Sequence, residues 1–151
     1  MKVADILAVK GRVVVTVQAS DSIETLSQRL REKRIGAAVV SGDGYRVDGV
    51  ISERDIAYAL AVHKGDLHTL PVADLMTATV ITCAPGDTVS SVASKMVARN
   101  IRHVPVVEED RLVGMISIRD VLNFRVDDLQ RQTGMLRAFV SESAREPQDR
   151  E

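Results

Sequence analysis

The stretch G-V-I-S-E-R-D at residues 49–55 returns as G-M-I-S-I-R-D at residues 114–120. Each copy has a glycine and an apolar pair, then a serine, and an aspartate three residues after the serine. A short apolar run that ends in Ser-x-x-Asp is typical of a strand that gives way to a helix, because the serine can cap the first helical turn. The sequence therefore predicts the same strand-to-helix junction twice.

The repetition extends over most of the 151 residues. V-A-D-I-L at residues 3–7 returns as V-A-D-L-M at residues 72–76, a shift of 69 residues, and further matches follow at shifts of 65 and 66. The small drift in the shift indicates short insertions in loops, where insertions are tolerated. Halves of about 65 residues are too small to be comfortably stable alone, so we expect the two to pack together about a pseudo-twofold axis.

Hydrophobic periodicity predicts the order β-α-β-β-α in each half, and hence the α/β fold class. In the first half we expect strands at residues 13–17, 37–40 and 46–51 and helices after Asp21 and at 53–62. Asp21 and Glu24 have the spacing of a capping box, and Gly36 is expected to end the helix that they begin. In the second half we expect strands at residues 80–82, 104–107 and 111–117 and helices at 89–99 and from about 119.

The predicted organisation has three parts. The first repeat covers residues 1–68, the second covers 69–125, and a helical extension with a polar tail covers 126–151. In the last helix, apolar side chains and one threonine alternate steps of four and three residues: Leu122, Val126, Leu129, Thr133, Leu136 and Val140. This stripe fits either a seam with a partner helix or a face that covers the chain's own core.

The repeated motif also has a chemical interpretation. A carboxylate such as that of Asp55 or Asp120 can accept two hydrogen bonds from a vicinal diol, and the 2′ and 3′ hydroxyls of a ribose form such a diol. The arginine before each aspartate and the free amides at the helix start can meet a phosphate. Gly49 and Gly114 would allow close approach of backbone or ligand. Alternatively, Ser-x-x-Asp is only a helix cap, an interpretation that a second in-register copy makes less favourable.

These features resemble a tandem pair of CBS domains, named after the regulatory region of cystathionine beta-synthase. The resemblance covers about residues 1–125 and is carried by the repeated motif, by the strand ends at Thr16 and Thr82, and by I-R-H-V-P-V-V at residues 101–107. More narrowly, the chain looks like short stand-alone bacterial proteins that hold only this pair. The family binds AMP, ADP, ATP, NAD(H) or S-adenosylmethionine in two clefts between the halves.

The resemblance implies two sets of nucleotide-binding residues. In one cleft, the ribose would be held by Ser117 and Asp120, the phosphates would lie toward Arg119 and His103, and the adenine would be flanked by Thr16, Val17 and Ala38. The other cleft would use Ser52, Arg54 and Asp55, with the adenine near Ile35, Gly36, Ala37, Thr82, Val104 and Pro105. Because Gly36 and Ala37 stand where the second half has Arg102 and His103, we expect the two clefts to differ in their phosphate contacts.

Composition narrows the function classes. The formal net charge is −1 and aromatic residues make up 3% of the chain, which favours neither a nucleic-acid nor a membrane surface. The N-terminus does not look like a signal peptide and no apolar run is long enough to span a bilayer, so we expect a cytoplasmic protein. No Cys/His pair has metal-ligand spacing, and neither a Gly-x-Ser-x-Gly elbow nor a Walker loop occurs, so we expect no metal site and no catalytic residues.

The sequence therefore predicts a regulatory module that binds an adenine nucleotide, forms a homodimer and acts on a client protein that the sequence does not identify. Two alternatives stay open at this point. One is a nucleotide-metabolising enzyme, which would need a placed acid-base pair or a metal. The other is a structural dimerisation domain whose clefts are vestigial.

Overall fold

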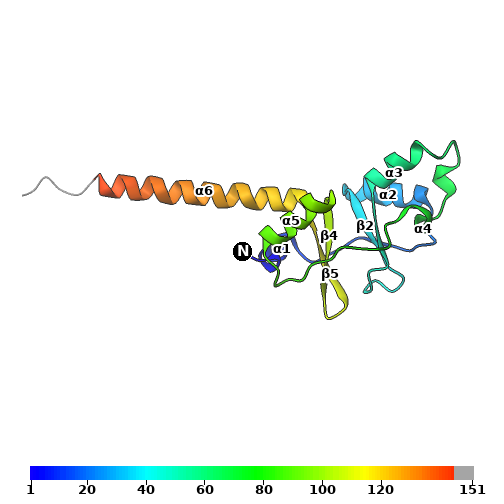
Figure 1. Cartoon of the computed structure of the whole chain (residues 1–151), viewed down its shortest axis with the longest axis horizontal. Coiled ribbons are helices and arrows are strands. Elements are labelled where there is room, and N and C mark those ends of the chain that lie inside the picture. Colours follow the sequence, from blue (N-terminus) through cyan, green and yellow to red (C-terminus); the bar gives the residue numbers. More distant parts are fainter. Residues whose placement is uncertain (145–151) are drawn as a thin grey trace, which may run out of the picture.

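The computed structural model describes residues 1–144 and contains two small sheets with helices around them (Figure 1). In the first sheet, β2 (Ala37–Val40) lies between β1 (Thr16–Val17), to which it is parallel, and β3 (Gly49–Ser52), to which it is antiparallel. The second sheet pairs β4 (His103–Glu108) with β5 (Arg111–Ser117) in antiparallel register. Buried Ala37, Val39 and Met115 pack together and join the two sheets.

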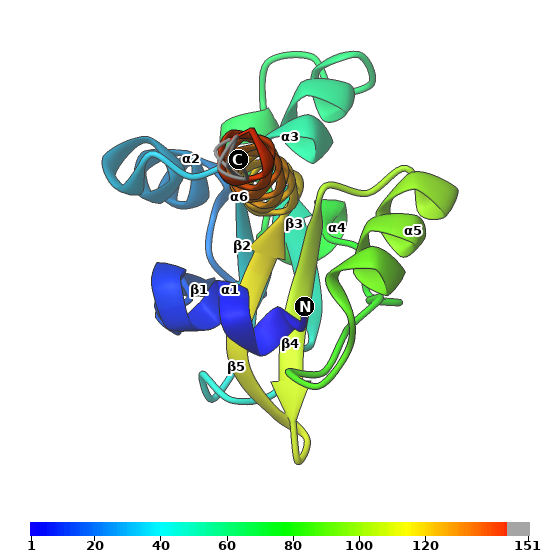
Figure 2. The same ribbon diagram turned by 90° about the vertical axis from the view of Figure 1, so that its left-hand side faces the viewer.

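The helices alternate with these strands as the repeat predicts. The first half holds α1 (Val3–Lys10), α2 (Ile23–Lys33), α3 (Glu53–Leu60) and a short 3-10 turn at Leu67–Thr69. The second half holds α4 (Val72–Leu75), α5 (Val89–Arg99) and α6 (Ile118–Ser143). Figure 2, which looks along α6, shows the strands in the middle, with α2 and α5 on opposite sides of them.

Each half lends its first helix to the other half. Val3, Ile6 and Leu7 of α1 are buried in the core that α5, β4 and β5 form. Val72 of α4 is buried in the core of the first sheet instead. The backbone repeats this exchange, since the Val3 amide donates to the Asp87 carbonyl at 2.9 Å and the Val72 amide donates to the Asp21 carbonyl at 2.8 Å. Neither core is complete without a helix from the other half, so the predicted boundary between residues 68 and 69 does not separate two independent packing units.

Two glycines permit this exchange. A β-carbon at Gly114 would lie 2.6 Å from Leu7 Cδ2, and one at Gly49 would lie 2.7 Å from Met76 Sδ and 3.0 Å from the Thr77 carbonyl oxygen. Leu7 and Met76 are themselves related by the shift of 69 residues. The close approach that the sequence predicts at these glycines is therefore made by the exchanged helices, and the atoms nearest to each belong to the chain's own packing.

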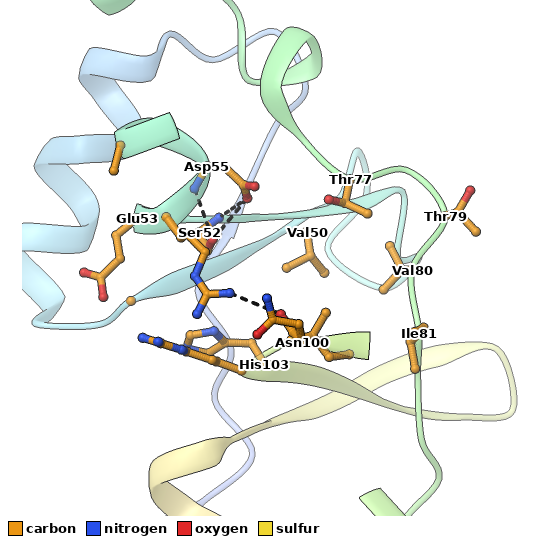
Figure 3. Close-up of a pocket in the computed structure, with 15 residues that line it drawn as sticks. Val50, Ser52, Glu53, Asp55, Thr77, Thr79, Val80, Ile81, Asn100 and His103 are labelled. Atoms are coloured by element: carbon orange, nitrogen blue, oxygen red, sulfur yellow. Dashed lines mark hydrogen bonds between the residues drawn. The ribbon is translucent and has the colours of Figure 1, made fainter. Parts of the chain in front are cut away.

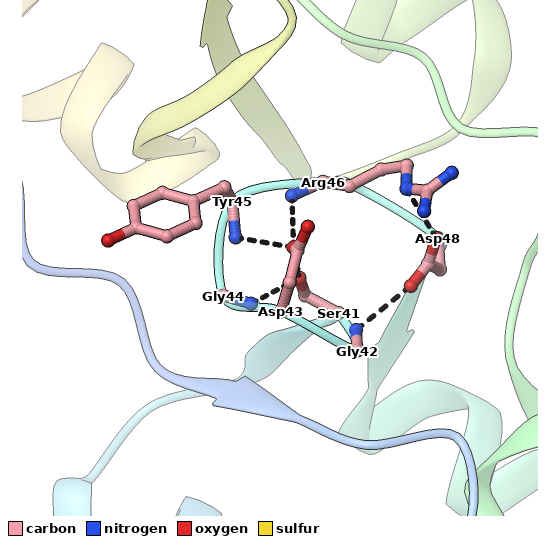
Figure 4. A network of polar contacts seen from close by, with 7 residues as sticks. All are labelled: Ser41, Gly42, Asp43, Gly44, Tyr45, Arg46 and Asp48. Atoms are coloured by element: carbon pink, nitrogen blue, oxygen red, sulfur yellow. Dashed lines mark hydrogen bonds and ion pairs between the residues drawn. The ribbon is translucent and has the colours of Figure 1, made fainter.

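The loop between β2 and β3 binds the first half to the second. Within it, the Asp43 carboxylate accepts from the Tyr45 amide at 2.9 Å and the Arg46 amide at 2.8 Å, which fixes the turn (Figure 4). The Leu112 amide of β5 then donates to the Tyr45 carbonyl at 2.7 Å. The Arg111 guanidinium lies 5.3 Å from the centre of the Tyr45 ring, within cation–π range.

Several local predictions are wrong in instructive ways. The strand expected at residues 13–17 is reduced to Thr16–Val17, and residues 80–82 form no strand, because pairing there is limited to a bridge from Cys83 to Val106. Ser22, and not Asp21, caps α2, since its hydroxyl accepts from the Thr25 amide at 3.1 Å. Arg34, in the left-handed conformation, ends α2 before Gly36 is reached. The helix at 89–99 and the strand at 111–117 are confirmed at both ends.

The last helix projects away from the rest of the described chain (Figure 1). Leu122, Val126, Leu129, Leu136 and Val140 are all more than half exposed, so the interpretation that this stripe covers the chain's own core is wrong. Residues 145–151 of the predicted tail lie outside the described residues. Within residues 1–144, no helix is both long and apolar enough to cross a membrane.

Candidate functional site

A cavity of about 380 Å³ opens where the two halves meet (Figure 3). We call it the Asp55 cleft. Three segments line it, namely the β3–α3 junction, the stretch after α4 and the turn that leads into β4. The lining residues from these segments include Ser52, Glu53, Arg54, Asp55, Thr77, Thr79, Val80, Ile81, Asn100, Ile101, Arg102 and His103. Its volume lies within the range of small-molecule sites, which run from about 300 to 1,000 Å³.

Asp55 stands at the start of α3 and is held there by Ser52. The Ser52 amide donates to Asp55 Oδ2 at 2.8 Å, and the Asp55 amide donates to the Ser52 hydroxyl oxygen at 3.4 Å. The Ser52 hydroxyl also donates to Oδ2, at 3.1 Å. The cap interpretation is therefore confirmed, but it uses one carboxylate oxygen: within residues 1–144 every hydrogen bond to this carboxylate goes to Oδ2. The other oxygen is left for a hydroxyl donor in the cleft.

The second copy of the motif makes the same cap and one more contact. The Ser117 amide donates to Asp120 Oδ2 at 2.8 Å, and the Asp120 amide donates to the Ser117 hydroxyl at 3.2 Å. In addition, the Lys10 ammonium lies 2.7 Å from Asp120 Oδ2. Burial opposes ionisation of Asp120, but the hydrogen bond and charge of Lys10, with the Ser117 amide, hold the pKa of Asp120 below its ordinary value. We call this position the Asp120 site.

His103 lies between the two positions. It lines the Asp55 cleft, yet Lys10 and Asp120 are among the charges that act on it. Burial and then the Lys10 charge lower the pKa of His103, against the opposing effect of Glu53 and Asp120. A neutral imidazole at this seam can accept a proton when an anion binds nearby.

Cationic side chains from both halves meet at the seam. Arg54 donates from Nη1 to the Asn100 carbonyl at 3.1 Å, across the boundary between the halves (Figure 3). Arg102 and His103 line the same cavity. Their guanidinium and imidazole groups have the chemistry that binds phosphate. Within residues 1–144 no group of three or more acidic, His or Cys side chains is arranged to hold a metal ion.

The structure brings some of the predicted residues together and separates others. Of the nucleotide-binding residues expected from the sequence, those that line the Asp55 cleft are Gly36, Ser52, Arg54, Asp55 and His103. The side chains of Val17, Ala37, Ala38 and Val104 are buried in the three hydrophobic clusters, so a ligand would meet their backbone only.

Other predicted residues lie outside the Asp55 cleft. Arg119 and Ile35 line a separate hollow over α2 and α3. The Thr16 carbonyl accepts from Arg29 at 2.7 Å, and the Pro105 carbonyl accepts from the Cys83 amide at 3.0 Å. Thr82 does not line any of the cavities described here. Whether these residues contact a ligand stays a prediction.

Sequence reasoning did not select several residues that line the cavity, among them Glu53, Thr77, Thr79, Val80, Ile81 and Asn100. One signal could have found Thr79. The shift of 69 residues that relates Leu7 to Met76 also relates Lys10 to Thr79. The two residues therefore hold equivalent places beside the two aspartates.

Comparisons with known proteins agree with this geometry. The sequence profile of the family described as CBS domain matches residues 3–62 and again residues 72–127. The solved structure of the CBS-domain containing protein ATU1752 from Agrobacterium tumefaciens is 39% identical in sequence, with a TM-score of 0.79 over 82% of this chain and 92% of that one.

Two further solved structures contain adenosine compounds. The CBS domain protein PAE2072 from Pyrobaculum aerophilum, complexed with AMP, is 34% identical with a TM-score of 0.70, over 80% of this chain and 89% of that one. The CBS domain pair of protein MJ0100, in complex with 5-methylthioadenosine and S-adenosyl-L-methionine, is 30% identical with a TM-score of 0.73, over 82% of this chain and 98% of that one. The chain spans 46%, 71% and 63% of the first three curated relatives that it matches.

Proposed function

Because the chain belongs to the CBS-domain family, with two CBS repeats in tandem, we propose that it is a regulatory module that binds an adenine nucleotide at the seam between the repeats. The observation that carries the proposal is the Asp55 carboxylate, which caps α3 through Oδ2 while it lines a cavity of about 380 Å³. Similar structures hold AMP, or methylthioadenosine with S-adenosylmethionine, which supports an adenosine ligand here.

The lining residues suggest how such a ligand would lie. The ribose diol would donate to Asp55, next to the amides at the start of α3. The phosphates would lie toward Arg54, Arg102 and His103, whose side chains offer cationic donors. The adenine would lie against the extended stretch of Thr79, Val80 and Ile81, where backbone groups can pair with its polar edge.

Calorimetry with AMP and 2′-deoxy-AMP tests this assignment. On the wild type, the deoxy compound should bind about 10-fold or more weakly, because one hydrogen bond to a charged group is lost. Asp55→Asn removes the charge but keeps an acceptor for the Ser52 amide, so α3 should stay capped while AMP affinity falls about 10- to 100-fold. Asp120→Asn is the matched variant, and it should leave AMP binding in the Asp55 cleft nearly intact.

Equal affinity of the wild type for AMP and 2′-deoxy-AMP would show that the diol is not recognised, and the aspartates would then be caps only. Parallel titrations with ADP, ATP, NADH and S-adenosylmethionine rank the ligands. We propose no catalytic role, so each nucleotide should be recovered unchanged after incubation. Turnover would favour the nucleotide-metabolising enzyme, and no binding by any of them would favour a structural module with vestigial clefts.

We also propose that the protein is a homodimer whose chains meet along α6. The helix runs from Ile118 to Ser143 and its apolar stripe is exposed, whereas an isolated helix of this length is marginal in water without packing. Alternating steps of four and three residues fit a partner helix of the same kind. Ligand binding would then act by changing the arrangement of the repeats or of the two chains, which act on an unidentified client protein.

Light scattering tests the dimer. The wild type should have twice the chain mass at micromolar concentration, and a Leu129→Asp, Leu136→Asp variant should be monomeric because charges would then face the seam. Arg131→Glu, which lies off the stripe, serves as the control and should stay dimeric. A wild type that is monomeric throughout the micromolar range would contradict the proposal. The cytoplasmic location expected from the sequence stays a prediction.

A further inference from the structure

Lys10 reaches from the end of α1 to the second copy of the repeated motif. Its ammonium donates to Asp120 Oδ2 at 2.7 Å and to the Met115 carbonyl oxygen at 2.8 Å. The Asp120 side chain is only 17% exposed, so the ion pair is partly sheltered from solvent. The carboxylate expected to bind a ribose is therefore already neutralised by a lysine 110 residues earlier in the sequence.

The Asp55 cleft has no such lysine. Among residues 1–144, Ser52 alone donates hydrogen bonds to the Asp55 carboxylate. The residue equivalent to Lys10 is Thr79, which lines that cleft with a short neutral side chain (Figure 3). Two sites built on the same motif thus differ in one charge at one equivalent position.

We propose that Lys10 makes the Asp120 site selective for phosphorylated adenine nucleotides over uncharged nucleosides. The proposal rests on the proposed function and names the ligand class of one of its two sites. A nucleoside that takes Asp120 with its ribose must displace the ammonium and offers no anion in return. A nucleotide displaces it too, but its phosphate supplies a new anionic partner within reach of the four-carbon side chain.

The surroundings of Lys10 support this exchange. The lysine side chain is 37% exposed, so it has room to leave Asp120. Its charge acts on His103 at the seam, which places the ammonium on the side where the predicted phosphate-binding residues lie. An anion between Lys10 and His103 would meet cationic or proton-accepting groups from both halves.

Calorimetry in an Asp55→Ala background isolates the Asp120 site. There, AMP should bind more tightly than adenosine. Lys10→Met should weaken AMP about 10- to 100-fold, since a hydrogen bond to a charged group is lost. The same substitution should leave adenosine binding equal or tighter, because no ammonium has to be displaced. Arg12→Met is the matched control: Arg12 contacts Glu108 at 4.0 Å on the surface, and its loss should change neither affinity.

A reciprocal variant tests the other cleft. In an Asp120→Ala background, Thr79→Lys should weaken adenosine binding in the Asp55 cleft, because the new ammonium would pair with Asp55 as Lys10 pairs with Asp120. An AMP-to-adenosine affinity ratio that Lys10→Met leaves unchanged would overturn the inference while the proposed function stands. If neither compound binds the wild type at all, the proposed function fails, and the inference with it.

Discussion

The contact between Gly114 and Leu7 allows a test of the exchanged-helix packing by double substitution. A methyl group on Gly114 would lie 2.6 Å from Leu7 Cδ2 and 3.1 Å from Cδ1, whereas carbon atoms pack best at about 3.5–4.0 Å. Leu7 is only 1% exposed, so its side chain must be pushed into neighbours that are packed already. We expect Gly114→Ala to lower the free energy of unfolding by about 1–3 kcal/mol.

The second substitution reverses the sign of the contact. Leu7→Ala alone should cost about 2–5 kcal/mol, because it leaves a cavity under β5. When Gly114→Ala is added to Leu7→Ala, the new methyl group enters that cavity without a clash, so the double variant should be no less stable than Leu7→Ala alone. The coupling free energy should therefore reach about 1–3 kcal/mol in the direction of rescue.

Urea unfolding of the four proteins measures this coupling, and thermal unfolding checks it at about 2–4 °C per kcal/mol. Gly134→Ala is the matched control: nothing lies within 4 Å of its added methyl group, and alanine favours the helix there. Additive effects within about 0.5 kcal/mol would refute the reasoning, because Gly114 and Leu7 would then not share a contact. At Gly49 the Thr77 backbone carbonyl is also in the way, so truncation of Met76 should rescue Gly49→Ala only in part.

Two further predictions concern ionisable groups. Hydrogen bonds from the Arg46 and Tyr45 amides lower the pKa of Asp43, so the stability this carboxylate contributes is present above its unfolded value of about 3.9 and is lost as the pH falls through its folded value. Urea unfolding should therefore show Asp43→Ala less stable than wild type at pH 7, with the gap narrowing below about pH 4; a gap that does not change with pH would contradict this. For His103, burial and the Lys10 charge lower the pKa, so Lys10→Met should raise it in an NMR titration. An unchanged His103 titration would place the ammonium away from the seam.

Much of the fold could be predicted from the sequence because its information is local. Val89, Val92 and Met96 fall at helical spacing and are buried on one face of α5, as the periodicity indicates. The strand expected at residues 80–82 fails for a different reason. A strand exists only through its partner, and beside β4 the chain makes two backbone hydrogen bonds at Cys83 before it turns away. No pattern within the segment itself reports how long that pairing lasts.

The site divides in the same way. Ser52 and Asp55 could be found because cap and ligand chemistry share one short motif. Lys10 could not be assigned to Asp120, since its partner lies 110 residues away and a lysine at the end of a helix is ordinarily a surface residue. The internal repeat carries the missing information in its differences: wherever the two copies of this chain diverge at equivalent positions, as Lys10 does from Thr79, the two sites must diverge in chemistry.

The same divergence bears on how a signal could leave the molecule. Asp55 begins α3, which ends after eight residues, whereas Asp120 begins α6, which continues for 26 residues along the exposed stripe. A ligand that displaces Lys10 from Asp120 therefore acts on the first turn of the helix that we propose joins two chains, and it loosens the tie between that turn and α1. If the ligand changes the affinity of the chains for each other, dimerisation must change the affinity for the ligand by the same factor. A ligand in the Asp55 cleft has no such rigid connection to the seam. The asymmetry between the repeats thus favours a division of roles, in which the Asp120 site is coupled to assembly and the Asp55 cleft binds its ligand without altering the dimer.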